Sequence, residues 1–127
     1  MIDRILQEVQ LLQKQYGVVE YNSNGKWVLI KNYQLPTGWN REQTDILINI
    51  PAGYPTTPPD NFFVPMGFKL ANGTDINAYT EPHPHWDAQW GQFSYHSEGD
   101  WIPSNTLEGD TLLTFMLSVK KRLSEIN

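Results

Sequence analysis

The chain has 127 residues, and a length of this order suits one compact domain, so we expect a single domain over residues 1–127. A formal net charge of −5 and the lack of any long basic run argue against nucleic-acid binding. The sequence has no cysteine, which excludes disulfides, thiolate metal sites and a thiol nucleophile. No apolar stretch is long enough to cross a membrane, and the N-terminus does not resemble a secretory signal, so a cytoplasmic location is expected.

The N-terminal segment predicts an amphipathic helix from about residue 2 to residue 15. Asp3 suits the positive end of the helix dipole, and Gly17 is a natural C-terminal cap. Arg4, Glu8 and Lys14 are expected to point away from the apolar face. The apolar positions recur at spacings of three and four: Ile2, Ile5, Leu6, Val9 and Leu12.

The next segment predicts three strands of an antiparallel meander. Residues 18–21 and 27–30 are rich in β-forming residues and flank an Asn-Gly turn, which is typical of a hairpin. Residues 43–50 alternate between apolar and polar and predict a third strand. Residues 51–59 contain four prolines, which exclude a helix or a central strand there. Residues 61–65 are then expected to form a short edge strand.

The second half of the sequence predicts a long loop followed by one helix. Residues 66–103 show no long periodic segment, and long irregular regions of a compact domain are usually functional. A continuous apolar stripe predicts a helix from about residue 106 to residue 125, with Asn105 and Glu108 spaced as in a capping box. The order of helix, three or four strands, loop and helix indicates an α+β fold.

Four short motifs make this chain resemble the ubiquitin-conjugating superfamily, in particular its prokaryotic family E type. They are YPTTPP at 54–59, HPH at 83–85, GQFS at 91–94 and WIP at 101–103. They stand in the family's order and with similar gaps, and the resemblance covers roughly residues 1–125. It implies an N-terminal helix, a meander sheet of three to four strands, a long active-site loop and a C-terminal helix packed on the sheet. The family's further C-terminal helices are missing, so a reduced C-terminus is expected.

The resemblance also implies a function and a site. Ser94 lies where the family has its catalytic cysteine, and His85 lies where it has an asparagine. The family accepts the C-terminal acyl group of a ubiquitin-like protein from an activating enzyme and passes it to an amine. The implied partners are therefore a ubiquitin-like protein, an activating-type enzyme and a JAB-type peptidase encoded nearby. No cofactor or metal is implied.

A serine nucleophile makes stricter demands than a cysteine. Its hydroxyl is far less acidic than a thiol, so a general base has to accept its proton. The only three histidines of the chain fall within fourteen positions of one another, and His96 or His85 is the expected base, while His83 has a structural role in relatives. The acidic residues available to orient a base are Asp87, Glu98 and Asp100.

Several alternatives stay open on sequence grounds. The chain is a non-catalytic variant that binds a ubiquitin-like protein or a partner enzyme if the loop supplies no base. Ser97 competes with Ser94 for the nucleophile position if the loop is shifted by three residues. His83, His85 and His96 with Asp87 or Asp100 offer the donor types of a zinc site. If Ser94 stands in for a native cysteine, the position of the site is the same and the natural ester is a thioester.

Overall fold

The first element is a helix whose ends are set by capping residues. The computed structural model describes residues 3–83, 90–95 and 100–127, and the structural statements below concern these residues. Helix α1 spans Arg4–Tyr16, and the side chain of Asp3 accepts a hydrogen bond from the backbone of Ile5. Gly17, at a φ of 88°, donates its N–H to the carbonyl of Gln13 and ends the helix. The predicted N-terminal helix is confirmed, although it begins about two residues later and ends one residue later than expected.

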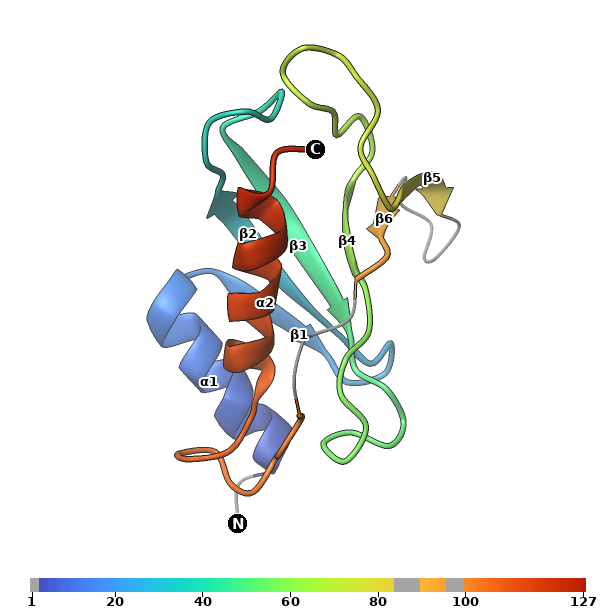
Figure 1. The fold of residues 1–127 in the computed structure, drawn as a ribbon. Coiled ribbons are helices and arrows are strands. Elements are labelled where there is room, and N and C mark those ends of the chain that lie inside the picture. The colour runs from blue at the N-terminus through green and yellow to red at the C-terminus, as the bar shows by residue number, and fades with distance from the viewer. Residues whose placement is uncertain (1–2, 84–89, 96–99) are drawn as a thin grey trace.

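The strands form one six-stranded sheet with the spatial order β1-β2-β3-β4-β6-β5 (Figure 1). Every pair of neighbouring strands is antiparallel. The two helices and the separate antiparallel sheet confirm the expected α+β class. The strand bounds are Val19–Asn22 for β1, Trp27–Gln34 for β2, Gln43–Asn49 for β3, Phe62–Pro65 for β4, Tyr79–His83 for β5 and Trp90–Phe93 for β6.

The first three strands match the sequence expectation. β1 and β2 form the predicted hairpin, in which Asn22 pairs with Trp27. The side-chain oxygen of Asn22 accepts a hydrogen bond from the backbone of Gly25 at 2.6 Å and so closes the turn. β3 pairs with β2 over most of its length and begins at the predicted residue.

The far half of the sheet differs from the expectation in two ways. β4 was predicted to be an edge strand, but it lies between β3 and β6. Residues 66–103 were predicted to be irregular, yet they contain β5 and β6, so the sheet has six strands rather than three or four. β6 has only four residues, which is too short to give a clear period in the sequence. Gly91 is required there because the hydroxyl of Tyr79, on β5, occupies the space of a Cβ.

The C-terminal helix is shorter than predicted. Helix α2 spans Leu112–Ser124 and begins after Thr111, not after Asn105. Asn105 instead closes a separate turn, in which its side chain accepts hydrogen bonds from Leu107 and Glu108, both at 2.8 Å. The expected capping box therefore belongs to a different pair, Thr111 and Thr114.

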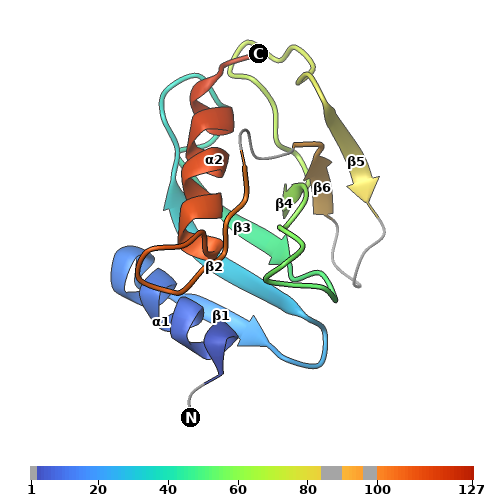
Figure 2. The ribbon, with the colours of Figure 1, turned by 60° about the horizontal axis from the view of Figure 1, so that its bottom comes forward.

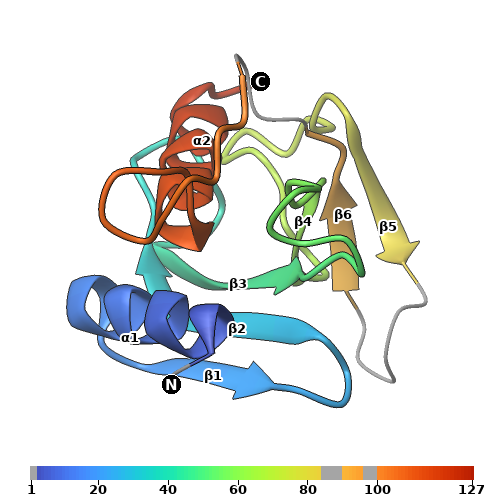
Figure 3. The ribbon, with the colours of Figure 1, turned by 90° about the horizontal axis from the view of Figure 1, so that it is seen from below.

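Both helices pack on one face of the sheet (Figures 1 and 2). Figure 3 shows α1 beside β1 and β2, and α2 across the middle of the sheet. The core between the helices and the sheet includes Phe62, Phe93, Phe115 and Met116, all fully buried. Because side chains alternate along a strand, the next residues face the other side, where a second cluster forms. This cluster consists of Leu29, Leu47 and Phe63, with Trp27 and Trp90 packed against it.

Candidate functional site

Ser94 lies directly after β6, at the point where the strand leaves the sheet. Its side chain is exposed, and its Oγ lies 3.4 Å from the side-chain amide nitrogen of Gln92. Phe93, between these two residues, is fully buried in the core under α2. Alternation along the strand therefore directs the hydroxyl of Ser94 away from the helices, toward solvent. An acyl donor would reach this oxygen from outside without displacing the core.

The backbone around Ser94 is held by hydrogen bonds to both neighbouring strands. Its own N–H donates to the carbonyl of Ala78, just before β5, at 2.8 Å. The next residue, Tyr95, is bound by Asn61, just before β4, in both directions. The N–H of Asn61 donates to the carbonyl of Tyr95 at 2.8 Å, and the N–H of Tyr95 donates to the side-chain oxygen of Asn61 at 2.9 Å. The chain at Ser94 is thus tied to its neighbours on either side.

The other predicted site residues fall largely outside the described part of the chain. His83 ends β5, where its backbone pairs with Trp90, and nothing is described of its side chain. His85 and His96, together with Asp87, Ser97 and Glu98, lie outside the described residues. Asp100 is described and exposed. The expectation that His96 or His85 serves as base stays a prediction, and so does the competing role of Ser97.

Two of the motifs contact each other in the structure. The indole N–H of Trp101 donates a hydrogen bond to the carbonyl of Pro55 at 2.7 Å, and its ring lies 6.2 Å from that of Tyr54. The WIP motif at 101–103 is therefore docked on the YPTTPP motif at 54–59. Trp101 and Tyr54 therefore pack the two motifs against each other.

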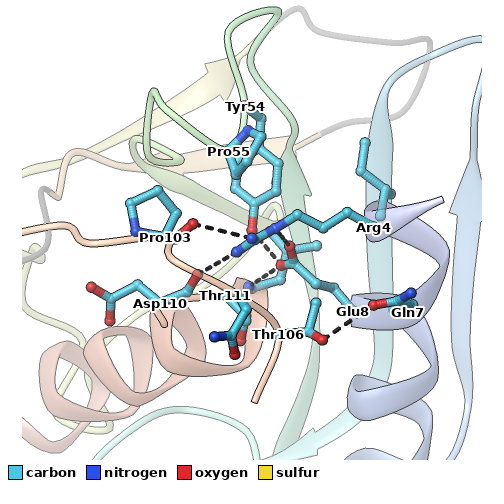
Figure 4. Close-up of polar contacts among 12 residues, drawn as sticks. Arg4, Gln7, Glu8, Tyr54, Pro55, Pro103, Thr106, Asp110 and Thr111 are labelled. Atoms are coloured by element: carbon cyan, nitrogen blue, oxygen red, sulfur yellow. Dashed lines mark hydrogen bonds and ion pairs between the residues drawn. The ribbon is translucent and has the colours of Figure 1, made fainter. Parts of the chain in front are cut away.

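A buried carboxylate lies next to these motifs (Figure 4). Glu8 of α1 is completely inaccessible to solvent, which contradicts the expectation that it points away from the apolar face. Its carboxylate accepts hydrogen bonds from the hydroxyl of Tyr54 and from the backbone of Leu112, the latter at 2.6 Å. The Nε of Arg4 pairs with its second oxygen at 2.8 Å. These three donors balance the cost of burying the charge.

The same network fixes the segment that leads from the candidate site to α2. The guanidinium of Arg4 donates to the carbonyls of Pro103 at 3.1 Å and Asp110 at 2.9 Å. Thr106 donates its hydroxyl to the side-chain oxygen of Gln7 at 3.1 Å (Figure 4). Arg4 was expected to point away from the apolar face, and in the structure its guanidinium bonds to Glu8 and to the segment before α2. The spacing of Arg4 and Glu8, four residues apart on a helix, was the only sequence sign of this pair.

The site region also contains tyrosines that resist ionisation. Burial raises the pKa of Tyr54 above its usual range, and the hydrogen bond to Glu8 raises that pKa further. Burial likewise raises the pKa of Tyr79, whose hydroxyl donates to the carboxylate of Glu81 at 2.7 Å. The backbone of Gly67 donates to the same oxygen of Glu81 at 3.1 Å. Both tyrosines are therefore neutral structural donors rather than acids or bases.

The geometry offers little to a metal ion. No group of three or more metal-ligating side chains occurs within residues 3–83, 90–95 and 100–127. The zinc alternative drew on His85 and His96, which these ranges do not include, so it stays untested. None of the helices in the described part of the chain is long and apolar enough to cross a membrane.

The fold and the site together define a class of protein. A helix, an antiparallel sheet, an exposed residue after a short strand, and a helix across the sheet are the features expected of an E2-like protein, that is, a relative of ubiquitin-conjugating enzymes. The family model of Prokaryotic E2 family E matches residues 5–126, and the chain belongs to this family. Comparisons with curated proteins and with solved structures gave no match. Membership makes the chain an E2-like protein of a prokaryotic conjugation system, which implies a ubiquitin-like protein and an activating enzyme as partners.

Proposed function

We propose that the protein carries the C-terminal acyl group of a ubiquitin-like protein as an oxyester on Ser94. It receives this group from an activating enzyme and passes it to an acceptor. The observation that carries the proposal is the position of Ser94, whose hydroxyl is exposed at the end of β6 while its backbone is bound to the neighbouring strands. Family membership over residues 5–126 supports the choice of reaction.

The transfer is an exchange of the acyl group from a thiol to a hydroxyl. The Oγ of Ser94 attacks the carbonyl carbon of the acyl group, the new C–O bond forms, and the bond to the thiol of the activating enzyme breaks. The proton of the hydroxyl passes to a base, and the departing thiolate takes up a proton in turn. His96 or His85 is proposed as that base, and His83 is proposed to support the loop. An acceptor nucleophile then attacks the oxyester and releases Ser94.

The experiment is a charging assay with the activating enzyme, ATP and the ubiquitin-like protein. We expect a covalent adduct that resists thiol reductants but is cleaved by hydroxylamine or mild alkali, as an oxyester is. Ser94→Ala should abolish the adduct. Ser94→Cys should give an adduct that reductant cleaves, because the acyl group would then be held as a thioester. Ser104→Ala, at an exposed position between the WIP motif and α2, is the matched control and should charge normally.

Other results would identify the alternatives. An adduct that persists in Ser94→Ala but is lost in Ser97→Ala would move the nucleophile to Ser97. The absence of any adduct, in a cascade that charges another carrier, would mean that this protein is a non-catalytic binding module. If charging occurs, the pH profiles of His96→Gln and His85→Gln identify the base, because loss of the base removes the dependence on imidazole ionisation near neutral pH. A JAB-type peptidase is proposed as the enzyme that reverses the conjugation.

A further inference from the structure

The two segments that bind the backbone of Ser94 and Tyr95 each contain a residue in the left-handed conformation. Four non-glycine residues of the described chain have a positive φ: Lys26, Asn32, Asn61 and Ala78. Two of them, Asn61 at 64° and Ala78 at 55°, are the residues that bind the backbone of Ser94 and Tyr95. Left-handed conformations cost free energy in residues that carry a Cβ, and they concentrate at functional sites. The strain here surrounds the exposed serine.

Asn61 is chemically suited to its place. Asparagine tolerates the left-handed region better than most residues, and its side chain offers a carbonyl oxygen at short range. At residue 61 both properties are used at once, because the left-handed backbone directs the N–H to the carbonyl of Tyr95 while the side chain accepts from the N–H of Tyr95. Glycine would keep the conformation but would lose the second bond.

The residues next to the Asn61–Tyr95 bonds are packed in the core. Phe62 follows Asn61, Phe93 precedes Ser94, and both side chains are fully buried. Their rings stack with centroids 4.7 Å apart and planes 11° apart, since the two residues are partners in the β4–β6 ladder. Any displacement of Ser94 relative to the sheet would therefore act on its own bond to Ala78 and on the two bonds between Asn61 and Tyr95, and the Asn61 side chain supplies one of these three. The contact between Gln92 and the hydroxyl, at 3.4 Å, is too long to hold the serine by itself.

We propose that Asn61 is a positioning residue for Ser94. It locks the residue that follows the nucleophile onto β4, so that the hydroxyl of Ser94 is presented at a fixed place and direction. The inference rests on the proposed function, because it concerns the same serine. Asn61 does not contact the reacting atoms, and its effect is on the geometry of the attack.

The test compares three variants in the charging assay. Asn61→Gly removes the side-chain acceptor and keeps a residue that adopts positive φ freely. We expect single-turnover charging to fall by about tenfold, with little change in the apparent affinity for the charged activating enzyme. Asn61→Asp keeps an oxygen at the same position and should restore most of the rate. Asn32→Gly is the matched control, since Asn32 has a φ of 56° and lies in β2, three strands away from β6.

A second measurement does not depend on the cascade. The chain has no cysteine, so Ser94→Cys supplies a single thiol for a nitroxide spin label. Combined with Asn61→Gly, the label should become more mobile than it is with Asn32→Gly or in the otherwise unaltered protein. Equal mobility and equal charging in the two glycine variants would overturn the inference even if Ser94 is the nucleophile. Failure of the unaltered protein to charge would refute the proposed function instead, and increased mobility alone would then assign Asn61 a structural role only.

Discussion

Glu8 is a charged residue at a position where the helical pattern of the sequence predicts solvent exposure. The pattern was misleading because α1 faces two different surfaces, the sheet on one side and the segment before α2 on the other. The apolar stripe identifies the first surface through Val9 and Leu12, whereas the second is polar and uses Glu8 and Arg4. No count of apolar residues detects a polar interface of this kind.

The buried carboxylate gives a residue-scale prediction. Glu8→Ala should lower the free energy of unfolding by about 3 kcal/mol, because it leaves the Tyr54 hydroxyl, the Leu112 N–H and the Arg4 guanidinium without their acceptor. Glu8→Gln keeps one carbonyl oxygen and should lose less. Glu20→Ala, on the exposed side of β1, is the control and should change stability by less than about 0.5 kcal/mol. Urea denaturation measures all three, and a Glu8→Ala protein as stable as Glu20→Ala would refute the role.

Ser94 is a different case at the residue scale, since motifs on either side single it out in the sequence as the candidate nucleophile, and that role stays a prediction. The structure places it directly after a strand with an exposed hydroxyl, where the sequence suggested an irregular loop. The residues that hold it were not predictable. Asn61 and Ala78 are 33 and 16 positions away in the sequence, and their roles depend on strand pairings that no local pattern contains.

At the scale of elements, the start of α2 shows how a sequence signal can be correct in type and wrong in place. Asn105 and Glu108 have the spacing of a capping box, but the turn that they form ends at Asp110, whose carboxylate accepts from the backbone of Ile102. The next residue, Thr111, is the N-cap of the helix that begins at Leu112, and its capping-box partner Thr114 lacks the usual acidic or amide side chain. The Thr111–Thr114 pair caps the helix, although its sequence signal is weaker, because Asn105 and Glu108 form a turn instead.

This difference yields an element-scale prediction. Thr111→Ala removes the side-chain oxygen that accepts from the N–H of Leu113 at 3.1 Å, and it should lower stability by about 1 kcal/mol. Thr111→Ser keeps the hydroxyl and should be close to neutral. Denaturation followed by circular dichroism measures both. Equal losses in the two variants would show that packing of the threonine methyl, rather than capping, sets the contribution of this residue.

Some strands were predictable from local sequence signals and others were not. The first hairpin and β3 were predictable because their turn chemistry and alternation are local. β5 and β6 were missed because each is short, and the contact between the Tyr79 hydroxyl and Gly91 leaves no local pattern in the sequence. β4 was predicted but assigned to an edge, since only the presence of β6 makes it internal. Non-local pairing thus created the part of the sheet that carries Ser94.

At the scale of the whole molecule, the sheet separates two environments. Its helix-bearing face holds the main core, and its other face carries the smaller cluster of Leu29, Leu47 and Phe63. Ser94 and Gln92 belong to the second face, away from both helices. A ubiquitin-like protein attached to Ser94 would therefore leave the helical face free, and the network of Glu8 would not have to open during transfer.

Burial of tyrosines at several places in the molecule makes the free energy of unfolding depend on pH in the alkaline range. Burial raises the pKa values of Tyr16, Tyr33, Tyr54 and Tyr79 above the value of about 10 that tyrosine has in an unfolded chain. Above that pH the unfolded chain loses these protons while the folded protein keeps them. The folded state then binds more protons than the unfolded state, so stability is intact below about pH 10 and falls as the pH rises toward the raised values.

Urea denaturation at about pH 8 and pH 11 should show this fall, and the double variant Tyr54→Phe with Tyr79→Phe should show a smaller fall from a lower starting stability. The slope with pH is the decisive quantity, because lysine deprotonation contributes equally to both proteins. An unchanged slope in the double variant would mean that these two tyrosines ionise in the folded protein as they do in the unfolded one.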